Sequence, residues 1–130
     1  MKIKIVSIPV RDQEKALRFY ADILGFVKKI DMPISEDSRW LTLVSSKDQT
    51  GPELLLEPAP NHFEPSKVFQ EALFKAGIPW TQFYVEDVSS EYERLKDLGV
   101  RFSVEPKDVG TYRIAVFDDT CGNYIQIVEE

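Results

Sequence analysis

The sequence predicts an α+β protein built from two tandem βαβββ modules, and three observations carry this prediction. Short runs rich in β-branched and aromatic residues alternate with polar or Pro-containing turns, which is typical of strands. Two stretches carry apolar residues at helical spacing, each opened by Asp and closed by Gly. The arrangement occurs twice, because residues 85–87 (VED) match residues 10–12 (VRD) and residues 98–100 (LGV) match residues 24–26 (LGF).

The first module is expected over residues 1–58. Residues 2–10 (KIKIVSIPV) predict a strand buried on both faces, and Asp12 is expected to cap the following helix. Gly25 is expected to end that helix, whose apolar stripe consists of Ala16, Phe19, Tyr20, Ile23 and Leu24. Three more strands are expected at residues 26–31, 39–46 and 53–57.

A connecting segment, residues 59–77, is expected to follow. Pro58, Pro60 and Pro65 are expected to exclude regular structure from its start, and apolar residues over 68–73 predict a short helix.

The second module is expected over residues 78–130, and we expect the whole chain to form a single domain. Asp87 and Gly99 should bound its helix, as Asp12 and Gly25 bound the first. Its strands are predicted at residues 79–86, 100–105, 112–118 and 123–129.

The composition limits the class of protein. The chain has 130 residues, 43% of them hydrophobic, which is enough for a packed core and too many for a disordered chain. Its net charge of −6 and the lack of a basic stripe exclude nucleic acid as an expected partner. No apolar run approaches the roughly 18 residues of a membrane span, and residues 1–10 do not form a signal peptide. The single cysteine, Cys121, excludes an internal disulfide, so we expect a cytoplasmic protein without membrane partners.

The duplicated pattern resembles the vicinal-oxygen-chelate superfamily, the glyoxalase, bleomycin-resistance and extradiol-dioxygenase group. The resemblance is carried by residues 8–12 (IPVRD), residues 83–87 (FYVED), the two Leu-Gly pairs, and residues 117–127 (FDDTCGNYIQI). This last segment is similar to the family's F-x-D-P-x-G-N-x-x-E-L. The resemblance implies that the two modules form an open, cup-shaped, eight-stranded mixed sheet with the helices outside.

The resemblance also implies where a metal would bind, since enzymes of this family hold a divalent cation on the first and last strand of each module. Carried over residue by residue, these positions fall on Ile5, Leu54, Trp80 and Gln126. Ile and Leu offer no donor atom, and an indole offers only its N–H. We therefore expect no metal and no other cofactor. A shift of one residue would bring Glu53 to the site, but Glu53 and Gln126 alone would bind a metal poorly.

Alternation along the strands predicts which side chains face the implied cup. The expected ligand-binding residues are Ile5, Ser7, Leu54, Leu56, Trp80, Gln82, Tyr84, Tyr124 and Gln126, with His62 of the connecting segment over the mouth. Such a lining suits an organic ligand held by apolar burial and a few hydrogen bonds. The same side chains could instead fill a core, and His62 could be an ordinary turn residue. Arg39 and Arg113 could reach the rim, and the sign of the ligand's charge stays open.

We expect a metal-independent small-molecule binding protein that resembles the bleomycin-resistance branch, holds a hydrophobic or aromatic ligand, and forms a homodimer. The alternative is a divalent-metal-dependent lyase, isomerase, transferase or dioxygenase of the same superfamily. It would use a displaced metal site recruited from His62, Glu53, Glu57 or Gln126. A third possibility is an interaction module without a cavity. No catalytic residue is assigned.

Overall fold

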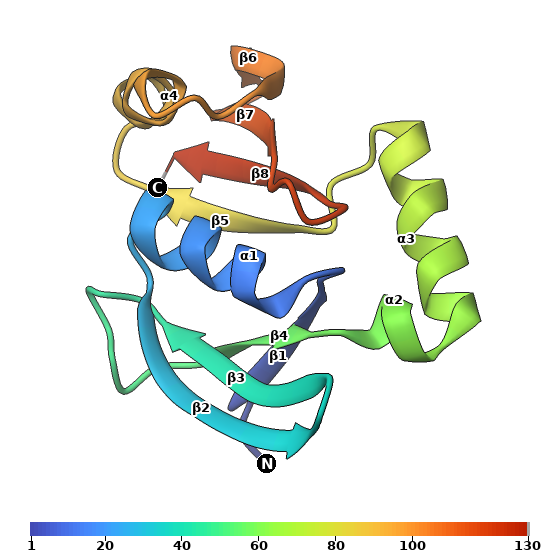
Figure 1. Cartoon of the computed structure of the whole chain (residues 1–130). Helices are drawn as coiled ribbons and strands as arrows, with labels where there is room; N and C mark the ends of the chain where they lie inside the picture. Colours follow the sequence, from blue (N-terminus) through green and yellow to red (C-terminus); the bar gives the residue numbers. More distant parts are fainter. Residues whose placement is uncertain (130) are drawn as a thin grey trace. The chain divides into compact units, whose positions relative to one another are not determined.

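The structure is a computed structural model that describes residues 1–129 (Figure 1). The chain divides into two compact units, Met1–Val68 and Phe69–Glu130. Helix α3 (Glu64–Ala76) crosses the boundary, so its first residues belong to the first unit and the rest to the second.

The first unit is a βαβββ module. It contains β1 (Ile5–Pro9), α1 (Gln13–Leu17), the π-helical turn η1 (Arg18–Ile23), β2 (Val27–Ser35), β3 (Ser38–Val44), β4 (Glu53–Glu57) and α2 (Ala59–His62). Its sheet has the order β1-β4-β3-β2, and only the β1–β4 pair is parallel.

The second unit repeats this arrangement. After α3 it contains β5 (Thr81–Val85), α4 (Val88–Asp97), β6 (Phe102–Val109), β7 (Tyr112–Asp118) and β8 (Tyr124–Glu129). Its sheet has the order β5-β8-β7-β6, again with one parallel pair, β5–β8. The predicted fold class is confirmed as two open, four-stranded mixed sheets.

The caps predicted for the two main helices are present in both units. The Asp12 carboxylate accepts a hydrogen bond from the Lys15 backbone N–H at 2.9 Å, and Asp87 accepts from the Ser90 N–H at 2.7 Å. Gly25 and Gly99 both have φ of +87°, a left-handed conformation that ends a helix and favours glycine.

The prediction that prolines exclude regular structure from the connecting segment is wrong. Pro60 lies in the first turn of α2, and Pro65 is the second residue of α3. The first N–H groups of a helix have no partner inside the helix, so a proline there loses no hydrogen bond.

Two predicted strand bounds and one burial prediction also need correction. Strands β2 and β6 run past the predicted ends at residues 31 and 105, through Pro33 and Pro106. Both are outermost strands with register shifts, where a missing N–H is tolerated. Strand β1 is not buried on both faces, because it also lies at a sheet edge and leaves Ile5 exposed.

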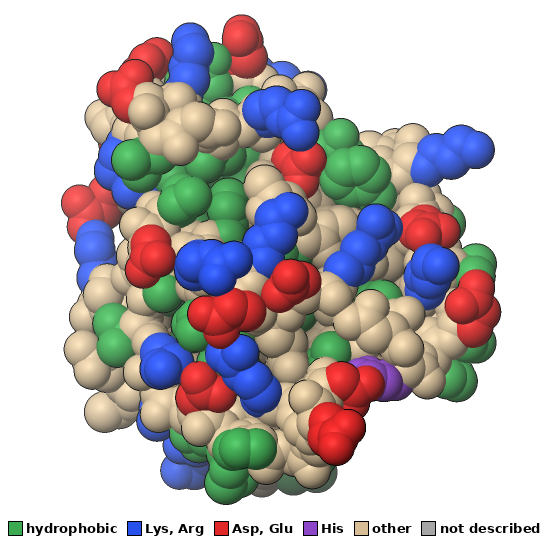
Figure 2. Space-filling view, in the orientation of Figure 1, with side chains coloured by type: hydrophobic (Ala, Val, Ile, Leu, Met, Phe, Trp, Pro, Cys, Tyr) green, Lys and Arg blue, Asp and Glu red, His purple; other side chains and the backbone are tan. Residues whose placement is uncertain are grey.

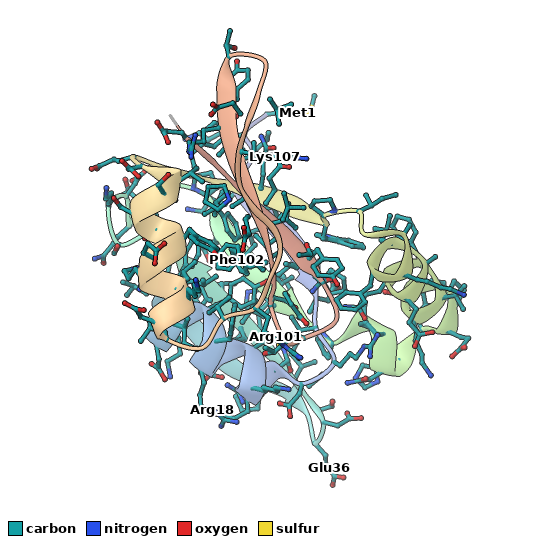
Figure 3. All side chains as sticks on the ribbon, turned by 90° about the horizontal axis from the view of Figure 1, so that it is seen from above. Met1, Arg18, Glu36, Arg101, Phe102 and Lys107 are labelled. Atoms are coloured by element: carbon teal, nitrogen blue, oxygen red, sulfur yellow. The ribbon has the colours of Figure 1, made fainter. Side chains whose placement is uncertain are left out.

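Each unit packs its helix against one face of its sheet. In the first unit, α1 contacts β3 and β4, and the fully buried residues include Ile8, Ala16, Tyr20, Leu41, Leu43 and Leu56. In the second unit, the buried residues include Val88, Leu95, Ala115, Phe117, Ile125 and Ile127. Phe102 of β6, labelled in Figure 3, packs edge-to-face against Tyr92 of α4 and Phe117 of β7.

A buried polar network holds α3 on the turn before β8. The Gln70 side-chain amide is 1% exposed and donates to the Cys121 carbonyl at 3.3 Å and to the Asn123 side-chain oxygen at 3.1 Å. The fully buried Asp119 carboxylate accepts from the Cys121 N–H at 2.7 Å, the Asn123 N–H at 2.9 Å and the Asn123 amide at 2.8 Å. Satisfied networks of this kind fix one conformation.

We predict that Asp119→Ala lowers the free energy of unfolding by about 3 kcal/mol, because it leaves several buried donors without an acceptor. Urea denaturation followed by far-ultraviolet circular dichroism measures this. Asp118→Ala is the control, since that carboxylate accepts the exposed Thr120 N–H bond and should cost about 1 kcal/mol or less. Equal losses in both variants would contradict a dominant role for the buried network.

Candidate functional site

The strand register decides which side chains share a face in the first unit. Parallel pairing places Ile5 beside Glu53 and Ser7 beside Leu55. Val6 and Ile8 lie beside Leu54 and Leu56, and neighbouring residues in a parallel pair point to the same side. The expectation that Leu54 and Leu56 share a face with Ile5 and Ser7 is therefore wrong. They lie on the face that α1 covers, and Leu56 is fully buried.

The opposite face of this sheet, which we call the first distal face, contains Ile5, Ser7, Thr42, Glu53 and Leu55. Its central feature is a buried ionised carboxylate. Glu53 is 4% exposed, and its Oε2 accepts a hydrogen bond from the Thr42 hydroxyl at 2.8 Å. Its Oε1 lies 3.1 Å from the Lys29 ammonium and 3.9 Å from that of Lys4.

The surroundings of Glu53 keep it charged. Hydrogen bonds from Thr42 and then Lys29 hold the pKa of the Glu53 carboxyl below its usual value, against the opposing effect of burial. Lys29 reaches this carboxylate from the register shift in β2 between Lys28 and Ile30. A sequence cannot reveal such a bulge, so Lys29 was not predicted as a partner. The only available signal is that a glutamate within a buried strand needs a counter-ion.

The second distal face lies opposite the buried side of the sheet in the second unit. Gln82 of β5 pairs with Gln126 of β8, and the Trp80 backbone N–H donates to the Tyr124 carbonyl at 2.8 Å. By alternation this face carries Trp80, Gln82, Tyr84, Tyr124 and Gln126, all of them predicted site residues. Their side chains are exposed or half-buried.

A chain of polar contacts crosses this face. The Gln126 amide donates to the Gln82 side-chain oxygen at 3.0 Å, and the Gln82 amide donates to the Tyr84 hydroxyl at 3.2 Å. Tyr84 is nevertheless 58% exposed, so its ring is available for contact.

Helix α3 adds two aromatic rings to this surface, and neither was predicted. Phe74 stacks on Tyr124 with ring centroids 4.3 Å apart and an interplanar angle of 2°. Phe69 meets Trp80 edge-to-face at 5.4 Å. Aromatic pairs in these geometries stabilise beyond their buried area. The predicted apolar stripe of this helix included Phe69 but no packing partner for it, and the stripe ended at Leu73, one residue before Phe74.

The remaining predicted residue, His62, lies in the first unit. His62 is exposed in α2, and its Nδ1 lies 3.9 Å from an Asp37 carboxylate oxygen in the β2–β3 turn. Figure 2 shows this histidine in purple beside red acidic side chains.

The two middle-strand arginines form the same contacts in each module. Arg39 donates to Asp31 at 3.0 Å and to Glu14 at 2.8 Å. The hydrogen bond with Glu14 is the larger cause, and the charge of Asp31 the smaller one, of a raised pKa of the Arg39 guanidinium. Arg113 donates to Asp108 at 2.8 Å and to the Ser89 hydroxyl at 3.0 Å. These groups hold helix α1 or α4 to its sheet, so their contacts are structural.

The residues present do not fit the family's divalent metal. In the second module, Gln126 pairs with Gln82, which lies three residues before Val85. In the first module, the residue three before Val10 is Ser7, and Ser7 pairs with Leu55. Leu55 is therefore the residue equivalent to Gln126. The four metal positions are therefore Ile5, Leu55, Trp80 and Gln126, of which one offers an oxygen donor.

Nearby donors do not replace the missing ligands. Glu53 lies two residues from Leu55 on the same face, but both of its oxygens already have partners. Residues 1–129 contain no group of three His, Cys, Asp or Glu side chains placed to hold a metal. Within the same residues, no helix is long and apolar enough to cross a membrane.

The family resemblance is confirmed. Residues 2–127 match the model of the Glyoxalase/Bleomycin resistance protein/Dioxygenase superfamily, and the chain belongs to this superfamily. It is 53% identical over 130 residues to YurT of Bacillus subtilis strain 168, an uncharacterized protein, with 100% of both chains covered.

Two solved structures are similar over nearly the whole chain. UcmS2 has a TM-score of 0.83 and 33% identity, covering 100% of this chain and 98% of that chain. TnmS3, an antibiotic binding protein from Streptomyces sp. CB03234, has a TM-score of 0.76 and 28% identity, covering 99% of this chain and 95% of that chain.

We predict that Glu53 makes stability depend on pH in the acid range. Its pKa in the folded protein lies below its ordinary value of 4.5, so its stabilising contribution is complete above that pH and is lost as the pH falls through the folded-state pKa. The stability difference between wild type and Glu53→Gln, measured by urea denaturation, should therefore be larger at pH 7 than at about pH 3. Glu57→Gln, an exposed change at the end of the same strand, is the control. A difference for Glu53→Gln that stays constant with pH would contradict this assignment.

Proposed function

We propose that the chain is a metal-independent binding protein for a hydrophobic or aromatic small molecule, resembling the bleomycin-resistance branch of its superfamily. The second distal face is the proposed contact surface. The observation that carries this proposal is the row of aromatic rings beside linked amide groups on one accessible side of a sheet. Rings supply apolar contact with specific geometry, and amides supply donors and acceptors that orient a ligand.

Two further findings support a binding role. The residues at the four metal positions do not fit the divalent metal that enzymes of the family hold there. TnmS3, a structural relative over nearly the full length, is an antibiotic binding protein. A metal-dependent enzyme remains the alternative, and no specific observation favours it.

We also propose that the protein acts as a homodimer in the cytoplasm. Strand β1 lies at the edge of its sheet, and Ile5 and Val6 within it are exposed, as is Ile3 just before it. Exposed apolar edge strands favour association with another strand. Sedimentation of the purified chain tests this part of the proposal.

The binding proposal predicts that naphthol, a planar aromatic alcohol, binds more tightly than decahydronaphthol, its saturated analogue. Calorimetric titration measures both affinities. Tyr84→Ala should weaken naphthol binding about tenfold, since an aromatic contact contributes up to about 1.5 kcal/mol. Leu98→Ala is the control, because Leu98 is 52% exposed and ends α4 of the same unit, on the side of the sheet opposite the second distal face. Equal effects of the two variants, or equal binding of the two alcohols, would overturn the proposed surface.

The metal part of the proposal has its own test. Elemental analysis of the purified protein should find no stoichiometric metal, and Zn, Ni, Mn, Co and Fe(II) salts should leave its melting temperature unchanged. A ligand that binds only the native state raises the melting temperature by mass action, so a tight site would be detected. Stoichiometric metal, or a shift of several degrees at low concentration, would favour the enzyme alternative.

A further inference from the structure

Two lysines converge on one carboxylate in the first unit, so positive charge exceeds negative charge in this cluster. The ammonium groups of Lys29 and Lys4 both lie near Oε1 of Glu53, at 3.1 and 3.9 Å. Glu53 needs one counter-ion, so the cluster of these three residues has a net charge of about +1. The whole chain carries −6, so this local charge opposes the overall sign.

The carboxylate of the cluster is fixed by a buried hydrogen bond, while its two lysines are accessible to solvent. The Thr42 hydroxyl fixes the second oxygen of Glu53, which leaves the carboxylate little freedom to turn. The Lys4 side chain is 63% exposed and that of Lys29 is 32% exposed. Each ammonium has three donors, so contact with Glu53 leaves further N–H groups to bind an incoming acceptor.

The neighbouring charges do not cancel this excess. Asp31 lies 3.4 Å from the Lys28 ammonium and also accepts hydrogen bonds from Arg39, so it is engaged elsewhere. Glu57 lies on the same face as Glu53 but four residues further along β4, which is about 13 Å. Next to Glu53 on the first distal face stand the half-exposed Ile5 and the hydroxyl of Ser7.

We propose that the Lys4–Glu53–Lys29 cluster binds the carboxylate or phenolate oxygen of a small organic anion. A single excess charge matches a monoanion, and Ile5 beside it matches an apolar body attached to that group. This site goes beyond the proposed function, because that function leaves the sign of the ligand open and uses residues of the second unit.

The test compares three probes that share one ring system and differ in charge: naphthoate, naphthylmethanol and naphthylmethylamine. Calorimetric titration at low ionic strength should show naphthoate binding about tenfold or more tightly than the other two. The preference should decrease as salt is added, since the lysines are partly exposed.

Two variants separate an anion site from an ion pair that only stabilises the sheet. Lys4→Gln should reduce the preference for naphthoate severalfold while the fold is kept, because this side chain is largely exposed. Glu53→Gln should increase naphthoate affinity, because it removes the competing negative charge and leaves both lysines. Lys28→Gln is the matched control and should change neither the preference for naphthoate nor its affinity, since Lys28 contacts Asp31.

Equal binding of all three probes would overturn this site while still supporting an aromatic-binding function. Binding by none of the three probes would also overturn this site. The naphthol titration tests the second distal face independently. A Glu53→Gln protein that folds and binds naphthoate no better than wild type would show that the lysines serve the fold alone. If that variant does not fold, the Lys4→Gln result decides.

Discussion

The parallel pairing of the first and last strand in each module is the constraint on which both units depend. It brings β1 beside β4 and β5 beside β8, although more than 30 residues separate the strands of each pair. Every other strand extends the sheet outward from this pair, and the helix after the first strand must cross one face to make the parallel connection. The pairing register also decides which side chains point away from the helix. A change of one residue in that register would exchange the covered and the distal face.

The two modules keep the same structural contacts while their distal faces differ. Arg39 and Arg113 each bind a carboxylate of the preceding strand and a residue at the start of the helix, Glu14 or Ser89. These contacts join the helix to the sheet in both modules. The distal faces lie on the other side of each sheet and do not make them. One has become a charged cluster around Glu53 and the other an aromatic surface around Tyr124.

The fold was readable from the sequence because its signals are local. Asp caps, Gly ends and alternating strands each depend on a few adjacent residues, and the repeat allowed one module to check the other. The side chains that share the second distal face could be predicted from the sequence, because Gly122 and Asn123 fix the position of Gln126 in β8. In the first unit a run of three leucines offered no such anchor, and the count went to Leu54 instead of Leu55. The Lys29 contact depends on a bulge and the Phe69 and Phe74 contacts depend on tertiary packing, and neither leaves a pattern in the sequence.

Glu53 and Tyr124 occupy equivalent positions in the two modules, and this has a consequence for how the sequences of the modules can diverge. Both residues occupy the same place in their copies, opposite Ile5 in one and bonded through the backbone to Trp80 in the other. A chain that carries two versions of one module can alter the chemistry of one version while the other preserves its own. The two halves of this chain therefore present different chemistry on equivalent backbone positions.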